Sequence, residues 1–344
     1  MGRNTVYNAG LVTLEKWEKV SKDNKNLMKD FLDYLRAQNR SPQTIFQYES
    51  QLKIVLCYIM ENFDNKFFCD IKKREWVRFV GYLVNDLDLS PNRVSSIKSA
   101  ISSMSNYIEN ILDEEYNYRN LIKNIPTPDK ATVRDKSVFT QEQMEEVLDE
   151  LVARGKLEVA CFLSLLMSCG CRKAEAIQMK VDFFTNKYLV LDNRFWLTPE
   201  IRCKGRGKQG KQLRKFVIVD RFSKYLNLWM EERKNKGINS EWLLPVYKDG
   251  NYEQPSIATA NSWVATISRI TEDKFQCDYY AHSSRHYFVT SLAKDGYPDA
   301  IITKIVGWAK GSNLIGVYND MTDDEELEGF FSKFGTESED LKGI

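Results

Sequence analysis

The chain has 344 residues, 43% of them hydrophobic and 28% charged, which is typical of a globular protein with about two domains and a sizeable core. No run approaches about 18 consecutive apolar residues and the first residues lack a signal peptide's apolar stretch, so neither a membrane span nor export is expected, and the cytoplasm is the default location. The formal net charge of +1 does not by itself indicate nucleic acid, but residues 319–344 hold nine acidic and two basic residues, which leaves +8 on the rest of the chain.

The seven cysteines predict neither a disulfide framework nor a metal site. Their number is odd and their spacing is irregular. Cys169 and Cys171 form the only close pair, and neither histidine of the chain lies near them in the sequence. Free cysteines usually behave as small hydrophobic residues, so we expect buried thiols and no structural zinc.

The first part of the chain is predicted to be a compact helical bundle. Apolar residues recur at helical spacing in four stretches between residues 25 and 112. Two of the stretches begin with Ser-Pro, at Ser41 and Ser90, which supplies a capping hydroxyl followed by proline in the first turn. Four basic residues could contact a DNA backbone, although each one taken singly suits a solvated face better: Arg74, Arg78, Arg93 and Lys98.

A polar stretch with two prolines, residues 120–136, is the predicted linker to a second domain. Thr140 to Gln143 resembles a capping box before an amphipathic helix, and residues 157–167 are apolar enough for a buried helix. Short β-strands are predicted at residues 188–191 and 216–219. The expected fold class is therefore mainly α with a small antiparallel β-sheet in the second domain, an α+β arrangement.

A basic stretch lies between the two predicted strands. It runs from Arg202 to Lys215 and contains seven basic residues and no acidic one. A solvated loop is one interpretation, and a basic hairpin that faces phosphates is at least as well supported because the flanks look like strands. Its candidate DNA contacts are Arg202, Arg206, Lys208 and Lys211.

Three segments of the second domain carry residues suited to phosphodiester chemistry. They read GCRKAE at residues 170–175, HSSRH at residues 282–286 and GWAKGSNLIGVY at residues 307–318. Without a metal, the charge that builds on the non-bridging oxygens needs cationic donors, and Arg172 and Arg285 offer planar forks that stay charged. The phenol oxygen of Tyr318 could attack the phosphorus, and a covalent phosphotyrosine would conserve the bond energy for ligation.

In this order the three segments resemble the motifs of the tyrosine recombinase family, also called the phage-integrase family. Residues 25–112 also resemble the family's helical core-binding domain, including a Ser-Pro-x-Thr helix start at Ser41. The resemblance covers nearly the whole chain. It implies a site-specific recombinase that cuts and rejoins DNA through a covalent 3′-phosphotyrosine, with no metal, ATP or other cofactor.

The resemblance implies that Arg172 and Arg285 clamp the scissile phosphate and that Tyr318, ten residues after Trp308, is the nucleophile. Trp308 stands where many family members carry histidine and a Cre-like subset carries tryptophan; its indole N–H can donate a hydrogen bond but cannot shuttle a proton. Tyr287 is expected to pack in the core. The other tyrosines that lie nearby in the sequence are Tyr279, Tyr280 and Tyr297.

Four further positions receive roles from the resemblance. His282 would hydrogen-bond the phosphate or accept the phenol proton, and His286 would support the site or the fold. Glu175 would orient a group of the site, with a plain ion pair within its helix as an equal alternative. The family's general acid is a lysine on a β-hairpin; Lys204 is the first choice, and its rivals are Lys208 and Lys211.

The resemblance also implies the organisation of the molecule, with two domains forming a C-shaped clamp on double-stranded DNA. Its segments are an N-terminal extension (1–24), a SAM-like core-binding domain (25–119), the linker (120–136), the catalytic domain (137–321) and an acidic C-terminal helix or tail (322–344). Protomers would bind inverted-repeat half-sites and form a homotetramer that exchanges strands through a Holliday junction. The C-terminal helix is expected to dock on the neighbouring protomer, with docking on its own domain as the alternative; its apolar stripe is Leu327, Phe330, Phe331 and Phe334.

Other functions stay open at this level. A telomere resolvase or a type IB topoisomerase would use the same transesterification, and a catalytically silent DNA-binding protein would share the fold. A metal-dependent nuclease is disfavoured because no acidic and histidine residues cluster at ligand spacing. The sequence identifies neither the target DNA site nor any accessory factor. It also leaves the biological task open between integration, excision, dimer resolution and inversion.

Overall fold

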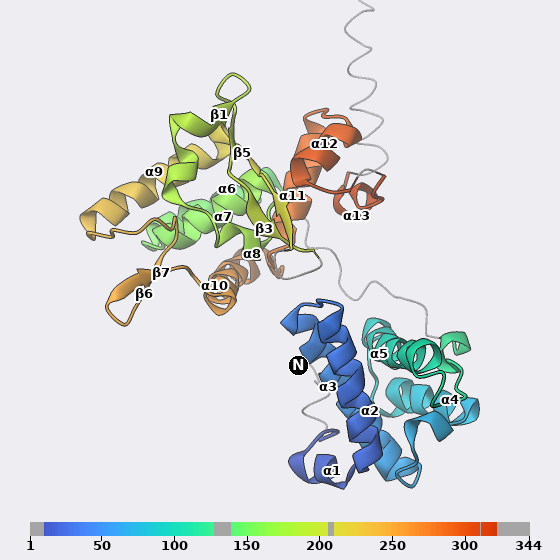
Figure 1. Ribbon diagram of the computed structural model, residues 1–344. Helices are drawn as coiled ribbons and strands as arrows, with labels where there is room; N and C mark the ends of the chain where they lie inside the picture. The colour runs from blue at the N-terminus through green and yellow to red at the C-terminus, as the bar shows by residue number, and fades with distance from the viewer. Residues whose placement is uncertain (1–9, 127–138, 206–209, 310, 322–344) are drawn as a thin grey trace, which may run out of the picture. The chain divides into compact units, whose positions relative to one another are not determined.

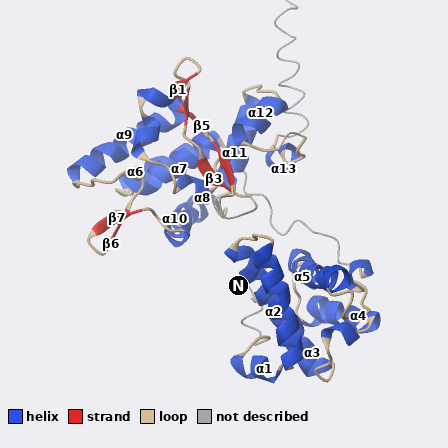
Figure 2. Cartoon of the chain, in the orientation of Figure 1, coloured by secondary structure: helices blue, strands red, loops and turns tan. Residues whose placement is uncertain are grey.

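The computed structural model describes residues 10–126, 139–205, 210–309 and 311–321. The described residues divide into two compact units, 10–126 and 139–321 with the gaps just given (Figure 1), and each unit has its own hydrophobic core. Among the described residues helices predominate, and the strands all lie in the second unit (Figure 2). The expected α+β fold class is confirmed.

The first unit is a bundle of helices around a buried apolar core. Its elements are α1 (Leu14–Lys19), α2 (Lys22–Ala37), α3 (Pro42–Asn62), η1 (Phe68–Asp70), α4 (Lys73–Gly81), η2 (Tyr82–Asp86), α5 (Pro91–Ile111) and η3 (Ile122–Asn124). Both predicted Ser-Pro helix starts are confirmed. The hydroxyl of Ser41 accepts the N–H of Thr44 at 3.2 Å, and that of Ser90 accepts the N–H of Arg93 at 3.4 Å.

The residues that follow α5 pack on this same unit. Ile122 and Ile125, near the start of the predicted linker, are buried in its core. The amide of Asn120 donates to the carbonyl of Ser102 at 3.1 Å. The described part of the predicted linker, residues 120–126, thus lies against the helical unit because its apolar side chains complete that core.

The buried helix α7 (Leu157–Cys169) runs through the centre of the second unit, as predicted from its composition. Residues 159–169 are all buried. The helix packs against α6 (Gln141–Ala153), α9 (Val219–Asn235), α10 (Ile257–Phe275) and α11 (Ser283–Lys294). The predicted capping box also starts α6, since Thr140 and Gln143 exchange two hydrogen bonds of 3.0 and 3.3 Å.

In the part of the chain that the structure describes, the strands form three small antiparallel sheets. They are β1 (Leu189–Val190), β2 (Phe195–Leu197) and β5 (Phe216–Ile218) in the order β1-β2-β5, β3 (Ile201–Cys203) with β4 (Lys211–Leu213), and β6 (Val246–Lys248) with β7 (Asn251–Glu253). The two predicted strands correspond to β1 and β5, and the basic stretch between them contains the β3–β4 hairpin, with Cys203 opposite Lys211. Strand β2 was not predicted because three residues are too few to show an alternation. Two 3₁₀ turns precede the sheet, η4 (Val181–Phe184) and η5 (Asn186–Tyr188).

The end of the second unit has a small core of its own. Helix α11 meets α12 (Asp299–Val306) and α13 (Ile315–Tyr318) around Phe288 and Ile302. Helix α12 ends at Gly307 with a φ of +79°, and a Cβ there would lie 2.9 Å from Leu213 of β4. Glycine therefore lets the end of α12 approach the hairpin. None of the helices described is both long and apolar enough to cross a bilayer.

Candidate active site

The tight end of helix α7 places the first arginine. The helix ends at Gly170 in the left-handed region, with a φ of +55°, which glycine adopts without a steric penalty. A Cβ at this position would lie 2.5 Å from the ring of Phe288 in α11. This close packing brings Arg172, at the start of α8 (Lys173–Ala176), towards the helix that carries Arg285.

The buried carboxylate of Glu175 connects the two arginines. Its Oε1 accepts Nη1 of Arg172 at 2.9 Å, and its Oε2 accepts the main-chain N–H of Arg172 at 3.0 Å and Nζ of Lys215 at 2.9 Å. Nη2 of Arg285 lies 3.8 Å from the same Oε2. Burial has the largest influence on the pKa of Glu175 and raises it, but Lys215 and Arg172 together outweigh burial and hold this pKa at about 2. Glu175 is thus ionised at neutral pH, and its contacts extend beyond its own helix.

Arg285 is a buried cation with unused donors. Its side chain is 1% exposed, and none of its three guanidinium nitrogens has a hydrogen-bond partner within the described residues. The indole nitrogen of Trp308 is likewise buried without a partner there, and the guanidinium lies 6.0 Å from the centroid of this ring. Burial, and then the charge of Arg172, lowers the pKa of Arg285. Buried donors without acceptors are costly, so this arrangement suits an anion from outside the chain.

Tyr318 lies beside this cluster. Its ring centroid is 4.6 Å from that of His286, 5.3 Å from that of Trp308 and 6.3 Å from that of His282. The Arg285 guanidinium is 5.8 Å from the centre of the Tyr318 ring. The four predicted partners of Tyr318 therefore surround it, although they come from two separate segments of the sequence.

The competing tyrosines occupy other environments. Tyr287 is buried in the main core of the second unit, as predicted. Tyr279 is also buried there, and its hydroxyl lies 2.6 Å from that of Ser284. Tyr297 packs against the small core around Phe288. Of the tyrosines in the part of the chain that the structure describes, Tyr318 is the one whose ring lies against both histidines.

His282 is solvent-exposed, and its ring centroid lies 6.3 Å from that of Tyr318. Partial burial is the largest of the influences that lower the pKa of His282, and the charges of Arg285 and Arg172 lower this pKa further. All these influences act in the same direction, so the imidazole is mainly neutral at pH 7 and can accept a proton.

The sequence did not reveal the partner of His286. Nδ1 of His286 lies 2.8 Å from Oδ2 of Asp320, and both side chains are nearly buried. The hydroxyl of Thr290 donates to the carbonyl of Tyr318 at 3.3 Å and accepts the N–H of Asp320 at 3.0 Å. These contacts join the carbonyl of Tyr318 and the side chain and N–H of Asp320 to α11. A lone aspartate two residues after a tyrosine carries no signal that would have identified this role.

The hairpin holds the candidate general acids. Lys204 and Lys211 are both exposed, near the end of β3 and in β4. Gln178 ties the hairpin to the end of α8, because its amide donates to the carbonyl of Arg202 at 2.9 Å and accepts the N–H of Arg202 at 3.1 Å. Two of the predicted DNA contacts, Arg206 and Lys208, lie outside the described residues.

The last lysine of the basic stretch is buried. Lys215 is 1% exposed and pairs with Glu175. In the sequence, Lys215 is one of seven basic residues in this stretch, and nothing distinguishes it from the others. Its burial was therefore not predicted.

The predicted DNA contacts of the first unit differ in exposure. Arg74 and Arg78 are exposed on α4, and Arg93 is half-buried near the start of α5. Lys98 is partly buried and donates to the carbonyl of Ile125, and burial lowers its pKa. The ammonium of Lys98 therefore already contacts the main chain of its own unit.

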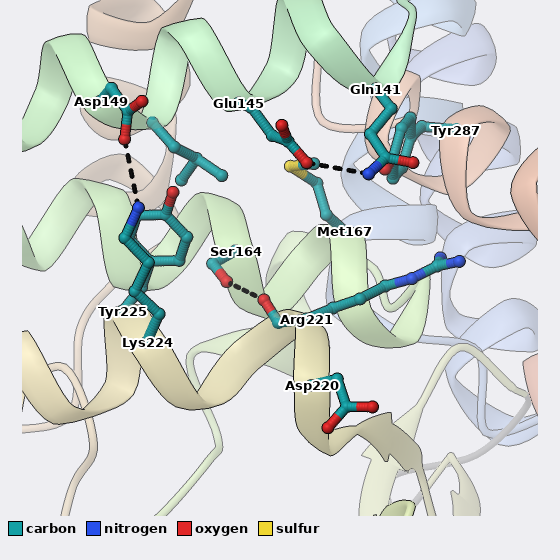
Figure 3. A pocket seen from close by; sticks show the side chains of 11 residues that line it. Gln141, Glu145, Asp149, Ser164, Met167, Asp220, Arg221, Lys224, Tyr225 and Tyr287 are labelled. Carbon is teal, nitrogen blue, oxygen red and sulfur yellow. Dashed lines mark hydrogen bonds and ion pairs between the residues drawn. The ribbon is translucent and has the colours of Figure 1, made fainter.

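A pocket elsewhere in the second unit has a different character. It has a volume of about 400 Å³ and is lined by residues of α6, α7 and α9, and by Tyr287, but by none of the predicted catalytic residues (Figure 3). Its charged lining is mixed, with Glu145, Asp149 and Asp220 beside Arg221 and Lys224. Across the described ranges, no group of three or more His, Cys, Asp or Glu side chains could hold a metal ion.

The chain is similar to known recombinases along most of its length. The family model described as the phage integrase family matches residues 137–325, more than half of the chain. The SPbeta prophage-derived recombinase-like protein YomM of Bacillus subtilis (strain 168) is 28% identical over 261 residues, which cover 74% of this chain and 75% of that protein. The tyrosine recombinase XerS of Streptococcus sanguinis (strain SK36) is 21% identical over 264 residues, which cover 69% of this chain and 70% of that protein.

Solved structures share the fold. The XerH site-specific recombinase, crystallised with its palindromic difH substrate as a post-cleavage complex, aligns with a TM-score of 0.63 at 19% identity, covering 92% of this chain and 85% of that chain. A lambda integrase dimer bound to a COC′ core site aligns with a TM-score of 0.60 at 13% identity, covering 86% of this chain and 95% of that chain.

Proposed function

The chain belongs to the phage integrase family and is a tyrosine site-specific recombinase, and on this premise we propose which residues cut and rejoin the DNA. In the cleavage step, Oη of Tyr318 forms a bond to the phosphorus, and the bond between the phosphorus and the 5′ oxygen breaks. The products are a 3′-phosphotyrosine and a free 5′ hydroxyl. Attack by another 5′ hydroxyl reverses the step and reseals the strand without ATP.

The observation that carries this proposal is the buried guanidinium of Arg285, which has no hydrogen-bond partner among the described residues. With Arg172 it would bind the non-bridging oxygens, and the indole N–H of Trp308 would add a third donor. Donors that are already desolvated and oriented stabilise the charge of the transition state without reorganisation. Glu175 would hold Arg172 in this orientation by a direct hydrogen bond, with Arg285 3.8 Å from its other oxygen.

His282 would take the phenol proton as Tyr318 attacks. Its lowered pKa leaves it in the basic form at neutral pH, and its ring lies near that of Tyr318. His286 would keep the phenol in position through its ring contact and its bond to Asp320.

Lys204 would protonate the leaving 5′ oxygen. It follows β3 directly and is exposed, so its ammonium can reach a bound strand. Lys208 and Lys211 are the rivals on the same hairpin. The neighbouring Arg202 and Arg206 would contact the backbone, and Arg74, Arg78 and Arg93 would do so from the first unit. Lys98 is the weakest of the predicted contacts there, because its ammonium already donates to the carbonyl of Ile125.

We propose that protomers bind inverted half-sites and assemble as a tetramer. The difH substrate of XerH is palindromic, and an inverted repeat gives two protomers equivalent sites. Residues 322–344, which lie outside the described part of the chain, would dock on the neighbouring protomer. Truncation after Met321 should then abolish the higher-order complexes in a mobility-shift assay while single-site binding persists; a truncated chain that no longer folds, judged by circular dichroism, would contradict the exchange.

A nicked suicide substrate tests the chemistry. The protein is incubated in EDTA with nicked duplexes that carry the repeats flanking its gene, and covalent complexes are separated on a denaturing gel. We expect a band with the native chain and none with Tyr318→Phe, which removes only the attacking hydroxyl. Tyr297→Phe is the matched control, because its ring packs on the small core beside the site. A band that survives Tyr318→Phe would assign the nucleophile elsewhere, and binding without any band would support a silent DNA-binding protein.

A further inference from the structure

Lys215 is a buried cation that none of the roles above uses. It lies between β4 and β5, and its Nζ is 2.9 Å from Oε2 of Glu175, with both side chains 2% exposed. Resting on the recombinase function proposed above, we propose that Lys215 is a positioning residue that acts through Glu175 on the two arginines of the site.

The fold holds Lys215 too tightly for contact with DNA. Its N–H donates to the hydroxyl of Thr198 at 2.9 Å, and its carbonyl accepts the N–H of Thr198 at 2.9 Å. Thr198 is itself buried and follows β2. Lysine is almost never buried unless it is paired, and here the pairing is with a carboxylate inside the protein. Lys215 therefore cannot serve as the general acid, although it belongs to the same basic run as Lys204.

The geometry around Oε2 of Glu175 shows what the lysine does. This oxygen receives the N–H of Arg172 and Nζ of Lys215 within hydrogen-bond distance, whereas Nη2 of Arg285 stays at 3.8 Å. That distance is too long for a hydrogen bond. Lys215 thus neutralises the carboxylate and occupies its second oxygen, so that the guanidinium of Arg285 keeps its donors for a phosphate.

Removal of the lysine should let the carboxylate capture the arginine. Oε2 of Glu175 would lose Lys215, its closest side-chain cation, and Arg285 is the next one within reach. A direct bond between them would satisfy both buried groups and would turn donors of Arg285 away from the phosphate. Neutralising Glu175 as well should release the arginine again, so the effect of the two changes is expected to be non-additive.

The test is single-turnover cleavage of the nicked substrate. Lys215→Met, which is similar in shape and has no charge, should slow formation of the covalent complex roughly 10–100-fold, as losses of supporting residues behind metal ligands do. The double variant Lys215→Met/Glu175→Gln should cleave at least about tenfold faster than Lys215→Met alone, since the competing carboxylate is gone. Lys224→Met is the matched control, because Lys224 makes an exposed pair with Asp149 at 3.3 Å in the same unit and should cleave at the native rate.

A second substrate distinguishes an effect on the two arginines from an effect on the general acid of the hairpin. With sulfur in place of the bridging 5′ oxygen, the leaving group needs no proton, because a thiol has a pKa of about 8.5. Lys204→Ala should recover on this substrate and Lys215→Met should not. Recovery of Lys215→Met would overturn the proposal, since the lysine would then act through the general acid. A double variant slower than Lys215→Met would also overturn it.

Control measurements distinguish a loss of folding from a loss of cleavage. Thermal unfolding is followed for every variant, and Lys215→Arg, which keeps the charge, should stay within about tenfold of native cleavage. A folded Lys215→Arg without cleavage would contradict a role based on charge, even if Lys215→Met does not fold. If the native chain forms no covalent complex, the recombinase chemistry itself fails; if it does and Lys215→Met cleaves at the native rate, only the role of Lys215 fails.

Discussion

The two halves of the proposed active site are held by different kinds of contact. The phosphate half consists of Arg172, Glu175, Lys215 and Arg285, whose mostly buried ionic contacts join α8 and the link between β4 and β5 to α11. The nucleophile half, Tyr318 with its neighbours His286, Trp308 and Asp320, depends on the four-residue helix α13, ring contacts and few hydrogen bonds. Around Tyr318 the chain is more open, and Val317 is 49% exposed.

The two halves differ in how much folding free energy they cost before DNA binds, and the phosphate half costs more. Buried cations without acceptors destabilise the folded chain, and a bound phosphate compensates for this when charge develops on its oxygens. The nucleophile can be displaced by breaking only a few weak contacts. Changes in the phosphate half should therefore affect the chemical step strongly. Changes in the residues around Tyr318, which leave its hydroxyl in place, should have a more modest effect because they only shift the position of the phenol.

The strongest test of this comparison is Arg285→Lys. The change keeps the charge but removes the planar fork, so the covalent complex should form roughly 10²–10³-fold more slowly in single-turnover assays. Affinity for a half-site should change far less, because most of it comes from other phosphates. Arg269→Lys, on the exposed face of α10, is the matched control. A loss below tenfold would mean that Arg285 contributes charge alone and that the two halves do not differ as described.

The pH dependence tests the residue that lies between the halves. His282 must be neutral to accept the phenol proton, and its pKa lies below the ordinary 6.5, so cleavage should stay level from neutral pH down to about 6.5. Below the lowered pKa the rate should fall about tenfold for each pH unit as the imidazole becomes protonated. The acid limb should be absent in His282→Gln, which is slow at every pH. A limb that remains in that variant would assign the titration to another group.

The elements of the fold with local signals were predicted well from the sequence. The Ser-Pro starts of α3 and α5, the capping box of α6 and the apolar run of α7 each signal structure within a few residues. Strand β2 was missed because its three residues show no period, and its place is set by pairing with β5. The ordered motifs likewise indicated Arg172, Arg285 and Tyr318, which the structure brings together.

The residues that support the site could not be found in this way. Lys215 was one of seven basic residues in a run, and its burial follows from the strand pairing that surrounds Thr198. Asp320 contacts His286 from a distant position in the sequence, through a turn that packing on α11 determines. Tertiary packing determines these pairings, and no local pattern in a single sequence indicates them.

A smaller effect is expected from Asp320→Asn in the nucleophile half. The change removes the charge from the bond to His286 and loosens the segment that carries Tyr318. Covalent complex formation should slow about tenfold, with unchanged affinity for DNA, because the phosphate half is intact. Asp295→Asn is the control, since it sits in the exposed pair with Arg221 at the end of α11. A loss as large as that of Arg285→Lys would show that the nucleophile half is as tightly specified as the phosphate half.

The smallest effect should come from Thr290→Val, which keeps the shape of the side chain and removes its hydroxyl. That hydroxyl joins the carbonyl of Tyr318 and the N–H of Asp320 to α11, so its loss weakens the attachment of the nucleophile without altering any charge. A net hydrogen bond contributes about 1 kcal/mol, so cleavage should slow about fivefold.

The double variant Thr290→Val/Asp320→Asn tests whether the contacts made by Thr290 and Asp320 act cooperatively. If they do, the double variant should be hardly slower than Asp320→Asn alone, because one broken bond already frees Tyr318. If the two losses multiply instead, each contact holds the segment independently of the other.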